Sequence, residues 1–235
     1  VPDANTCVII PPAPNTSNVL GTNYNGFGKT LQVINGGSLT LHPSNTLTIT
    51  DFVEVRGASV FNIENTGSLI QINNVPNIGN ITYKRTANLR KQDYVYWSSP
   101  VANFASNAIS PGTSLGYQYK WTPTIATNFN FFGNWAAANE TMVLGKGYII
   151  RGPNAYSNAA LANYTATFFG VPNNGNITIP ISRGSYDGVN YPTGVSSTPG
   201  TKEDDNWNLV GNPYPSSINV LDFLILKLLN INNIL

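Results

Sequence analysis

The side chains that could carry catalysis are few in this chain of 235 residues. It holds one histidine, His42, one cysteine, Cys7, and eleven acidic residues. A hydrolase or transferase needs an acid, a base or a metal held in a pocket. Cys7 and His42 cannot by themselves build a disulfide or a Cys/His metal site. We therefore expect no histidine-based catalysis, and we expect that the protein is not an enzyme.

A pair of carboxylates could still hydrolyse glycosidic bonds, so a glycoside hydrolase stays open as the less favoured alternative. The cluster Glu203, Asp204 and Asp205 follows the polar segment "VSSTPGTK", which favours a solvated turn. Carboxylate oxygens in a loop also suit Ca²⁺, although the spacing is not that of an EF-hand. These three residues are a candidate Ca²⁺ site, and no other cofactor is expected. The acids considered for catalysis are Asp93, Glu140, Asp187, Glu203, Asp204 and Asp205.

The four tryptophans all lie in the second part of the chain, at positions 97, 121, 135 and 207. In a β-sandwich such rings serve first in the core, but exposed rings also stack on the faces of sugars. We expect Trp97, Trp121 and Trp207 in the core. Trp135 stands beside "AAAN" in an expected loop, and it is the candidate sugar-binding platform.

The composition indicates which kind of scaffold positions these residues. Charged residues make up 10% of the chain and the formal net charge is +1, against roughly 25% charged residues in a typical soluble domain. Turn-forming Asn, Gly, Thr and Ser are abundant, and strand formers outnumber helix formers. The chain is therefore expected to be all-β. The sequence contains no basic cluster of the kind that binds nucleic acid, so nucleic acid is not an expected partner. It also contains no apolar run of the ~18 residues that a membrane span needs.

Residues 31–72 contain a repeat of six to eight residues, in which an apolar, polar, apolar triplet is followed by a turn. Such short strands cannot bury a face alone, but strands coiled at a fixed period can stack into a parallel β-solenoid. Two or three blocks would make one coil of roughly 16 to 24 residues. A meander of tight hairpins is the alternative. The blocks are "LQVINGGS", "LTLHPSNT", "LTITDF", "VEVRGASV", "FNIENTGS" and "LIQINN".

Two details of the repeat are specific enough to test. The segment "CVII" at 7–10 would be an earlier strand of the same stack, and "PPAPNTSN" after it an irregular excursion or cap. In the last block Leu69 and Gln71 break the pattern of paired apolar residues. Ile70 and Ile72 there predict that the strand shifts by one residue. The sequence thus predicts a solenoid over residues 1–80, with residues 73–84 as the join to the next part.

From residue 81 the period is lost and longer aromatic or β-branched segments follow. They predict an antiparallel β-sandwich, jelly-roll or immunoglobulin-like, over residues 81–235, packed end to end on the solenoid. Its last strand would run from Trp207 and be stopped at Gly211–Pro215, where two prolines remove amide donors. The strand segments are "DYVYWSSPV", "LGYQYKWTP", "FNFFGNWAA", "KGYIIRGP", "YTATFFGVP", "GNITIPIS" and "NWNLVGNPY".

Several stretches together resemble the large surface proteins of Bacteroidetes, especially flavobacteria, that the type IX secretion system exports. They include "GGSLTL", "GNITYKRTANLRKQDYVYWSSPV", "GNWAAANETMVLGKGYIIRGP" and "DDNWNLVGNPYPSSINVLDFL", in the order of that family. The resemblance implies an adhesin-like protein displayed at the cell surface after export across the outer membrane. In that family the "GNPYPS" segment is followed by another aromatic strand, whereas here "LILKLLNINNIL" follows. We therefore expect the sandwich to be truncated at its C-terminal end.

These features together predict a non-enzymatic, extracellular structural or adhesive module, able to self-assemble into a surface layer or filament. Its expected partners are other copies of itself, other surface proteins and glycans. The exposed end of the solenoid near residues 1–25 is the expected contact between copies. A carbohydrate-binding module of a secreted protein is the main alternative.

Overall fold

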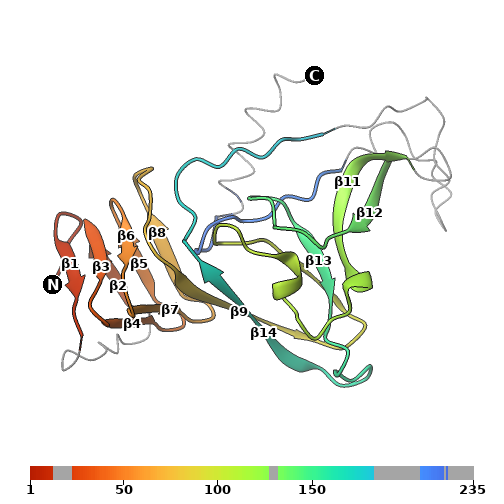
Figure 1. Cartoon of the computed structure of the whole chain (residues 1–235), viewed down its shortest axis with the longest axis horizontal. Coiled ribbons are helices and arrows are strands. Elements are labelled where there is room, and N and C mark those ends of the chain that lie inside the picture. Colours follow the sequence, from red (N-terminus) through yellow and green to blue (C-terminus); the bar gives the residue numbers. More distant parts are fainter. Residues whose placement is uncertain (13–22, 127–131, 183–206, 220, 222–235) are drawn as a thin grey trace.

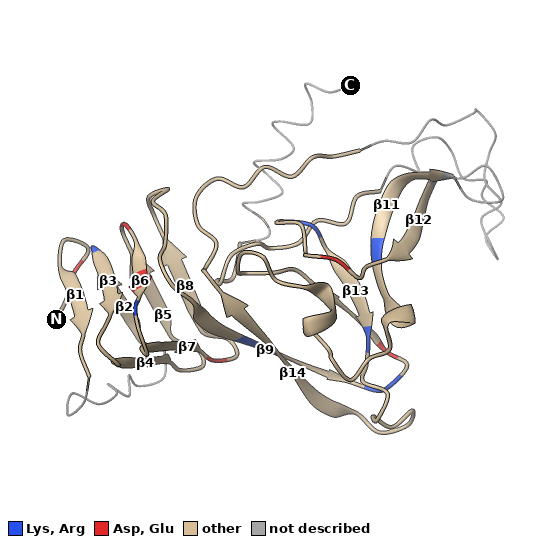
Figure 2. Ribbon diagram, in the orientation of Figure 1, with Lys and Arg blue, Asp and Glu red and all other residues tan. Residues whose placement is uncertain are grey.

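The computed structural model describes residues 1–12, 23–126, 132–182, 207–219 and 221. The chain is all-β, with a parallel β-solenoid of about 3 turns followed by an antiparallel part (Figure 1). Both features confirm the predicted fold class. Within the described residues no helix has the length and apolar character that a membrane crossing requires. Charged residues are sparse and lie scattered over both parts (Figure 2).

Three parallel sheets form the sides of the solenoid, and the chain visits them in turn. Leu31 pairs with Val53, Leu39 with Phe61 and Leu47 with Leu69, so one coil takes 22 residues. This period lies in the predicted range. The first side holds β1 (Cys7–Ile10), β3 (Thr30–Val33) and β6 (Val53–Val55), the second β2 (Asn25–Gly28), β5 (Thr46–Ile49) and β8 (Ser68–Gln71), and the third β4 (Ser38–Leu41), β7 (Val60–Ile63) and β9 (Ile81–Leu89).

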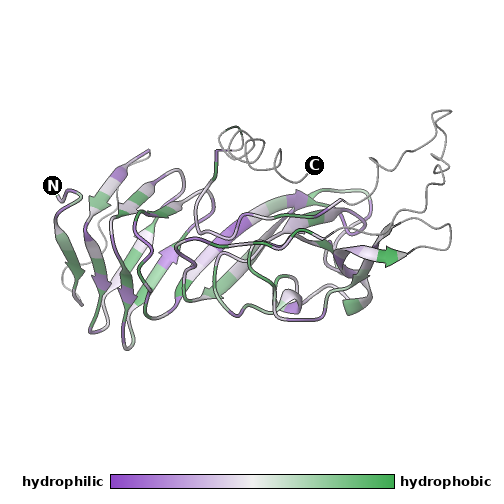
Figure 3. Ribbon diagram, turned by 90° about the horizontal axis from the view of Figure 1, so that it is seen from above, coloured by the Kyte–Doolittle hydropathy of each residue, from purple (hydrophilic) through white to green (hydrophobic). Residues whose placement is uncertain are grey.

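The repeat folds in this way because its inward residues and its turns both recur with the coil. Alternating residues point inward and form apolar columns, such as Leu41, Ile63 and Tyr83, all at most 4% exposed. The left-handed backbone also recurs every 22 residues, at Asn35 (φ 56°), Gly57 (φ 63°) and Gly79 (φ 80°). Figure 3 shows the resulting alternation of hydrophobic and hydrophilic residues along the strands.

The predicted one-residue shift in the last coil is wrong. Residues Ser68–Gln71 of β8 stay in register with Thr46–Ile49 of β5, and Leu69 is buried while Ile70 points outward. Gln71 therefore occupies an inward position. It exchanges two side-chain hydrogen bonds of 2.8 Å with Asn77, and it donates to the Asp51 carbonyl. Satisfied hydrogen bonds make a polar residue tolerable at this inward, partly buried position.

β9 joins the two parts of the molecule. It pairs in parallel with β7 at Asn62–Thr82 and Ile63–Tyr83, and along its whole length it pairs antiparallel with β14 (Ala162–Gly170). The predicted division between residues 80 and 81 falls at the start of this strand. The predicted join, residues 73–84, ends inside it. A single sheet of order β14-β9-β7-β4 therefore runs from one part into the other.

A second, antiparallel sheet lies opposite β9 and β14. Its buried face carries Tyr148, Ile150 and Gln118, each at most 1% exposed. Phe168 of β14 packs between the sheets against Phe104, with ring centroids 4.8 Å apart, and against Trp97 at 6.3 Å. Trp97 is thus a core residue, as predicted. The sheet has the order β10 (Tyr94–Trp97), β13 (Tyr148–Arg151), β11 (Gln118–Ala126) and β12 (Phe132–Ala137), and two short 3-10 helices, η1 (Ser106–Ala108) and η2 (Leu115–Tyr117), precede β11.

Two of the predicted strands of the sandwich are not strands. Residues 175–182 lie outside any strand, and residues 207–211 form one isolated bridge, between Val210 and Lys146. Trp207 is 69% exposed, so its predicted core position is also wrong. The turn at Gly211–Pro215 serves instead to reach the solenoid, because the Pro215 carbonyl accepts a hydrogen bond from Leu69 N–H at 2.8 Å.

Candidate functional site

The two ends of the solenoid differ in what meets their backbone edges. At the end nearer the sandwich all three sheets are continued. Ile78 exchanges hydrogen bonds with Val53 and Val55, β9 pairs with β7, and Pro215 meets β8. We call this the covered end. Sheet edges that are paired in this way offer no template for a further strand.

At the other end β1 and β2 pair with the rest of the solenoid on one edge, and no described strand meets their outer edges. We call these two strands the open end (Figure 1). Ile9 is 53% exposed and Phe27 46% exposed, while Val8 and Ile10 are half-buried against the core. The open end thus combines a sheet edge that has no partner among the described strands with apolar side chains, the features by which strands recruit further strands.

The antiparallel sheet has an aromatic outer face. Residues that pair across antiparallel strands point to the same side, so the register places the side chains of Tyr96, Ile149, Tyr119 and Ala137 in one row across all four strands. Trp121 and Trp135 form the next row on the same side. We call this surface the aromatic face. It is defined by Tyr94, Tyr96, Tyr119, Trp121 and Trp135.

Trp135, the predicted sugar platform, lies on this aromatic face. It belongs to β12, so the loop predicted around it is wrong, but its side chain is 38% exposed. Its ring packs edge to face on Trp121, with centroids 5.2 Å apart and an interplanar angle of 73°. Trp121 Nε1 in turn donates to the Trp207 carbonyl at 2.6 Å. Three of the four tryptophans therefore gather at one place on the sheet.

Arg151 lies at the other side of the same face. It is 6% exposed, and its guanidinium stacks over the Tyr117 ring at 3.4 Å from the centroid. Its Nη2 donates to Asn154 Oδ1 at 2.7 Å. Burial and the neighbouring Tyr119 raise the pKa of Tyr94, with Arg151 acting in the opposite direction. Because its pKa is raised, Tyr94 stays protonated and neutral at physiological pH. The aromatic face thus offers rings and hydroxyls and is defined by uncharged residues.

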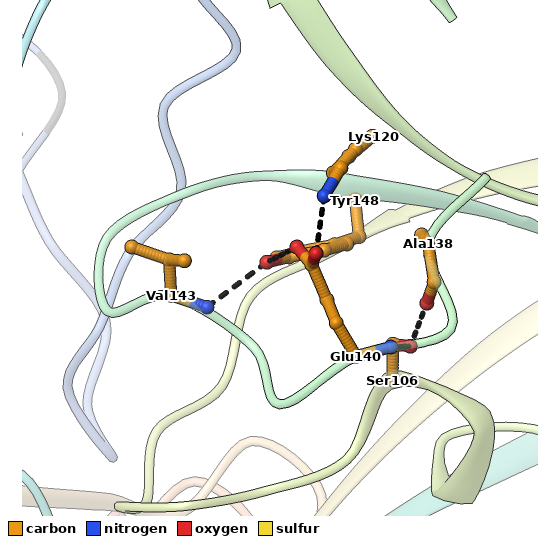
Figure 4. A network of polar contacts seen from close by, with 6 residues as sticks. All are labelled: Ser106, Lys120, Ala138, Glu140, Val143 and Tyr148. Atoms are coloured by element: carbon orange, nitrogen blue, oxygen red, sulfur yellow. Dashed lines mark hydrogen bonds and ion pairs between the residues drawn. The ribbon is translucent and has the colours of Figure 1, made fainter. Parts of the chain in front are cut away.

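Glu140, one of the acids considered for catalysis, is held in a network at the end of the same sheet (Figure 4). Its two carboxylate oxygens accept hydrogen bonds from Lys120 Nζ and from the Tyr148 hydroxyl. The Tyr148 oxygen accepts from Val143 N–H at 2.9 Å. Burial alone would raise the pKa of Glu140, but these donors outweigh it and lower the pKa. The carboxylate is therefore fixed in its ionised form, which ties the loop after β12 to β11 and β13.

Asp93 has a similar local role, because its Oδ2 accepts a hydrogen bond of 2.7 Å from Arg90 N–H across a turn. The other acidic predictions, Asp187, Glu203, Asp204 and Asp205, lie outside the described residues. In the described part of the chain no group of three His, Cys, Asp or Glu side chains could hold a metal ion. The Ca²⁺ site at Glu203, Asp204 and Asp205 stays a prediction.

One motif of possible chemical interest is Gly112-Thr113-Ser114-Leu115-Gly116, which has the Gly-x-Ser-x-Gly spacing of a nucleophile elbow. The structure gives it a different setting. Ser114 is exposed and precedes the one-turn helix η2, not a helix that follows a strand. Its Oγ accepts a hydrogen bond from Asn154 Nδ2 at 2.8 Å. His42 lies directly after β4 in the solenoid. This serine is therefore part of a structural turn.

Comparison with known proteins identifies the family of the chain but gives it no function. A family model described as Domain of unknown function (DUF8693) matches residues 1–235, and the chain therefore belongs to that family. Neither the curated proteins nor the solved structures contain a significant match to the chain.

Proposed function

We propose that the chain is a non-enzymatic structural or adhesive module of an extracellular bacterial surface protein, and that its copies associate through the open end of the solenoid. The observation that carries the proposal is the difference between the two solenoid ends. The covered end is completed by Ile78, β9 and Pro215, while β1 and β2 have outer edges that no described strand meets, together with exposed Ile9 and Phe27. The resemblance to exported flavobacterial surface proteins supports display at the cell surface.

A second copy is the occupant that the open end favours. Two open ends that meet about a two-fold axis would place equivalent edges side by side and bury the same apolar side chains from both copies. At the covered end Ile78, β9 and Pro215 already occupy part of each described edge, and they stand in the way of a further coil. A surface layer or filament therefore needs a second contact elsewhere on the molecule. The outer edges of β12 and β14, which no described strand meets, are candidates for it.

The test is the association state of the purified protein over a range of concentrations. We expect the wild type to form dimers or larger assemblies in analytical ultracentrifugation, and the double variant Ile9→Lys, Phe27→Lys to be monomeric, because charge on an edge strand opposes pairing. Val60→Lys is the matched control. Val60 is 42% exposed but lies on a coil that is paired on both sides. A wild type that stays monomeric at high concentration, with no assemblies in electron micrographs, contradicts the proposal.

Carbohydrate binding is a second candidate function, and the aromatic face is the observation that favours it. Trp135, Tyr96 and Tyr94 are each at least 38% exposed on one flat sheet, and such rings stack on sugars without needing charge. A glycan array decides it. We expect Trp135→Ala to weaken binding, while Phe169→Ala, which removes a 61% exposed ring on β14, leaves binding unchanged. Uniform background signal over all glycans would remove this candidate.

A further inference from the structure

A cleft opens at the place where the solenoid meets the sandwich. It lies between β9, β10 and the segment 209–217, and its volume is about 440 Å³. Its lining combines rings with small polar residues, among them Tyr83, Tyr96, Trp97, Tyr214 and Ser217. This size is in the range of pockets that bind small molecules. The cleft is separate from the open end, and its described lining includes neither Asp93 nor Glu140.

Among the described residues that line this cleft, Arg85 is the one that carries a charge. Its guanidinium stacks on the Tyr83 ring at 3.8 Å from the centroid. Its described hydrogen bonds go to backbone carbonyls, at 2.8 Å to Lys84 and Gly67 and at 3.4 Å to Glu64. The carboxylate of Glu64 forms a salt bridge of 2.8 Å with Lys84 Nζ. Arg85 is therefore a partly buried cation that no described carboxylate neutralises.

The state of this arginine suits an anionic ligand. Burial lowers the pKa of Arg85 to about 10, so the side chain stays charged at neutral pH. A guanidinium has five N–H donors, and the three carbonyl contacts leave Nε–H and one Nη2–H available. A charge that has lost part of its hydration gains most from an opposite charge, and the planar fork of arginine matches a carboxylate.

The rest of the lining indicates what kind of molecule would carry the carboxylate that binds Arg85. Tyr96, which is 62% exposed, and the half-buried Trp97 offer rings at the cleft, whereas the buried Tyr83 ring already packs against Arg85. Thr86, Ser216 and Ser217 add hydroxyl groups. Rings that pack on one face of a ligand and neutral hydroxyls that bond to its edge are suited to a sugar, which has apolar faces and a hydroxyl-rich rim.

We propose that this cleft binds a uronic acid unit, with its carboxylate on Arg85 and its sugar ring against the aromatic lining. The proposal goes beyond the association of copies and does not depend on it, because the cleft lies at the covered end of the solenoid. Variants that abolish association at Ile9 and Phe27 are expected to keep this binding. A failure of one proposal therefore leaves the other intact.

The first test uses the wild-type chain and titration calorimetry with trigalacturonate. We expect saturable binding that weakens at high salt, since it includes a charge pair. Neutral galactotriose should bind at least about tenfold more weakly, because it lacks the carboxylates that pair with the guanidinium. Equal binding of the two trisaccharides would overturn the proposal. Acetate, phosphate or a triglutamate peptide that binds as tightly as trigalacturonate would also overturn it, in favour of a general anion site or a peptide site.

Variants locate the binding at Arg85. We expect Arg85→Gln to weaken trigalacturonate binding at least about tenfold, while Lys91→Gln, which removes the same charge from a residue outside the cleft, leaves it unchanged. Arg85→Gln also loses contacts to the solenoid, so thermal melting must show that it folds. Tyr96→Ala provides a second variant that removes an exposed ring, with an expected loss of about two- to tenfold. Tyr96 also belongs to the aromatic face, so Trp135→Ala, which changes that face but not the cleft lining, is the control and should leave trigalacturonate binding unchanged. Unchanged affinity in both Arg85→Gln and Tyr96→Ala contradicts the assignment of the site.

Discussion

At the covered end of the solenoid Ile78, β9 and Pro215 continue the three sheets, whereas at the open end β1 and β2 have outer edges that no described strand meets. Both ends are built from coils of similar length, although the inward positions of β2 at the open end hold Gly26 and Gly28 where β5 has Leu47 and Ile49. The two ends also differ in what packs on the last coil. A repeat buries its neighbours but cannot cover its own ends, which need a segment of different sequence.

The burial of equivalent side chains reflects this difference. Ile63 is fully buried between Leu41 and Tyr83 in the coil next to β9. Ile10 stands at an equivalent inward position of β1, beside Val33, and is half-buried. The same residue type thus contributes differently to stability at the two ends, and substitutions at these positions measure the difference directly.

The largest change in stability is expected when an inward isoleucine near each end of the solenoid is replaced by alanine. Ile63→Ala should lower the free energy of unfolding by about 2–5 kcal/mol, because a fully buried column loses its contacts and a cavity remains. Ile10→Ala should cost about 1 kcal/mol, since part of its side chain already meets solvent. Urea denaturation followed by circular dichroism measures both. Equal losses at the two positions would show that the open end is as well packed as the covered one.

A smaller effect is expected from the polar contacts that complete the covered end. Asn77 accepts a hydrogen bond from Val53 N–H at 2.8 Å, exchanges two with Gln71, and donates to the Pro172 carbonyl at 3.0 Å. Asn77→Ala leaves these buried groups unpaired and should cost about 1–3 kcal/mol. Asn73→Ala removes an exposed contact to Asp51 and should cost less than about 0.5 kcal/mol. The thermal melting temperatures of the two variants test this. If they are equal, Asn77 does not hold the solenoid to the sandwich.

The smallest change in stability is expected at Glu54. This residue lies in a column of outward-facing residues, one from each coil, that runs from Ile9 at the open end through Gln32 and Glu54 to Ile78. Hydrogen bonds from Gln32 and Arg56 lower the pKa of Glu54, against the opposing effect of burial. A carboxyl group whose pKa is lowered on folding stabilises the fold above its ordinary pKa, and this contribution is lost as the pH falls through the lowered value.

Glu54→Gln should therefore destabilise the protein at pH 7 by less than about 1 kcal/mol, as Arg56 is largely exposed. The difference between wild type and variant should shrink as the pH is lowered from 5 to 3. Unfolding free energies from urea titrations at pH 7, 5 and 3 test this. A difference that stays constant over this range would show that the charge of Glu54 does not contribute.

The solenoid could be predicted from the sequence because its information is local. Pairs such as Leu31 and Val33 alternate with polar residues, and turn residues such as Asn35 and Gly57 recur at the coil period. The exception is Gln71. An apolar pattern assigns a glutamine to the outside, and nothing near it in sequence shows that Asn77 and the carbonyl of Pro172 complete its surroundings.

The joint and the cleft could not be predicted in the same way. β9 carries Lys84, Arg85 and Thr86 in its middle. These three consecutive polar residues interrupt the alternation of apolar and polar residues by which a strand is recognised in the sequence. They are accommodated because the turn Glu64–Gly67 of the preceding coil bonds to all three. In the sequence Arg85 is one of four basic residues scattered over positions 84–91, and its place in one cleft with Trp97 and Tyr214 arises from tertiary contacts.

The aromatic face is an intermediate case. The alternation of Tyr94 with Tyr96, and of Tyr119 with Trp121, is visible in the sequence and could have indicated one face of a sheet. The exposure of Trp135 agrees with what a sugar platform requires, but its partner does not follow from the sequence. The pairing of Trp135 with Trp121 depends on the register between β11 and β12, which local patterns leave open.

The 22-residue coil also makes the solenoid a spacer of adjustable length. Neighbouring strands in a sheet lie about 4.8 Å apart, so one additional coil inserted between β3 and β6 would move the open end about 4.8 Å away from the aromatic face and the cleft. Both ends of the solenoid would keep their residues. Relatives of this chain could therefore differ in reach by whole coils while they present the same two surfaces.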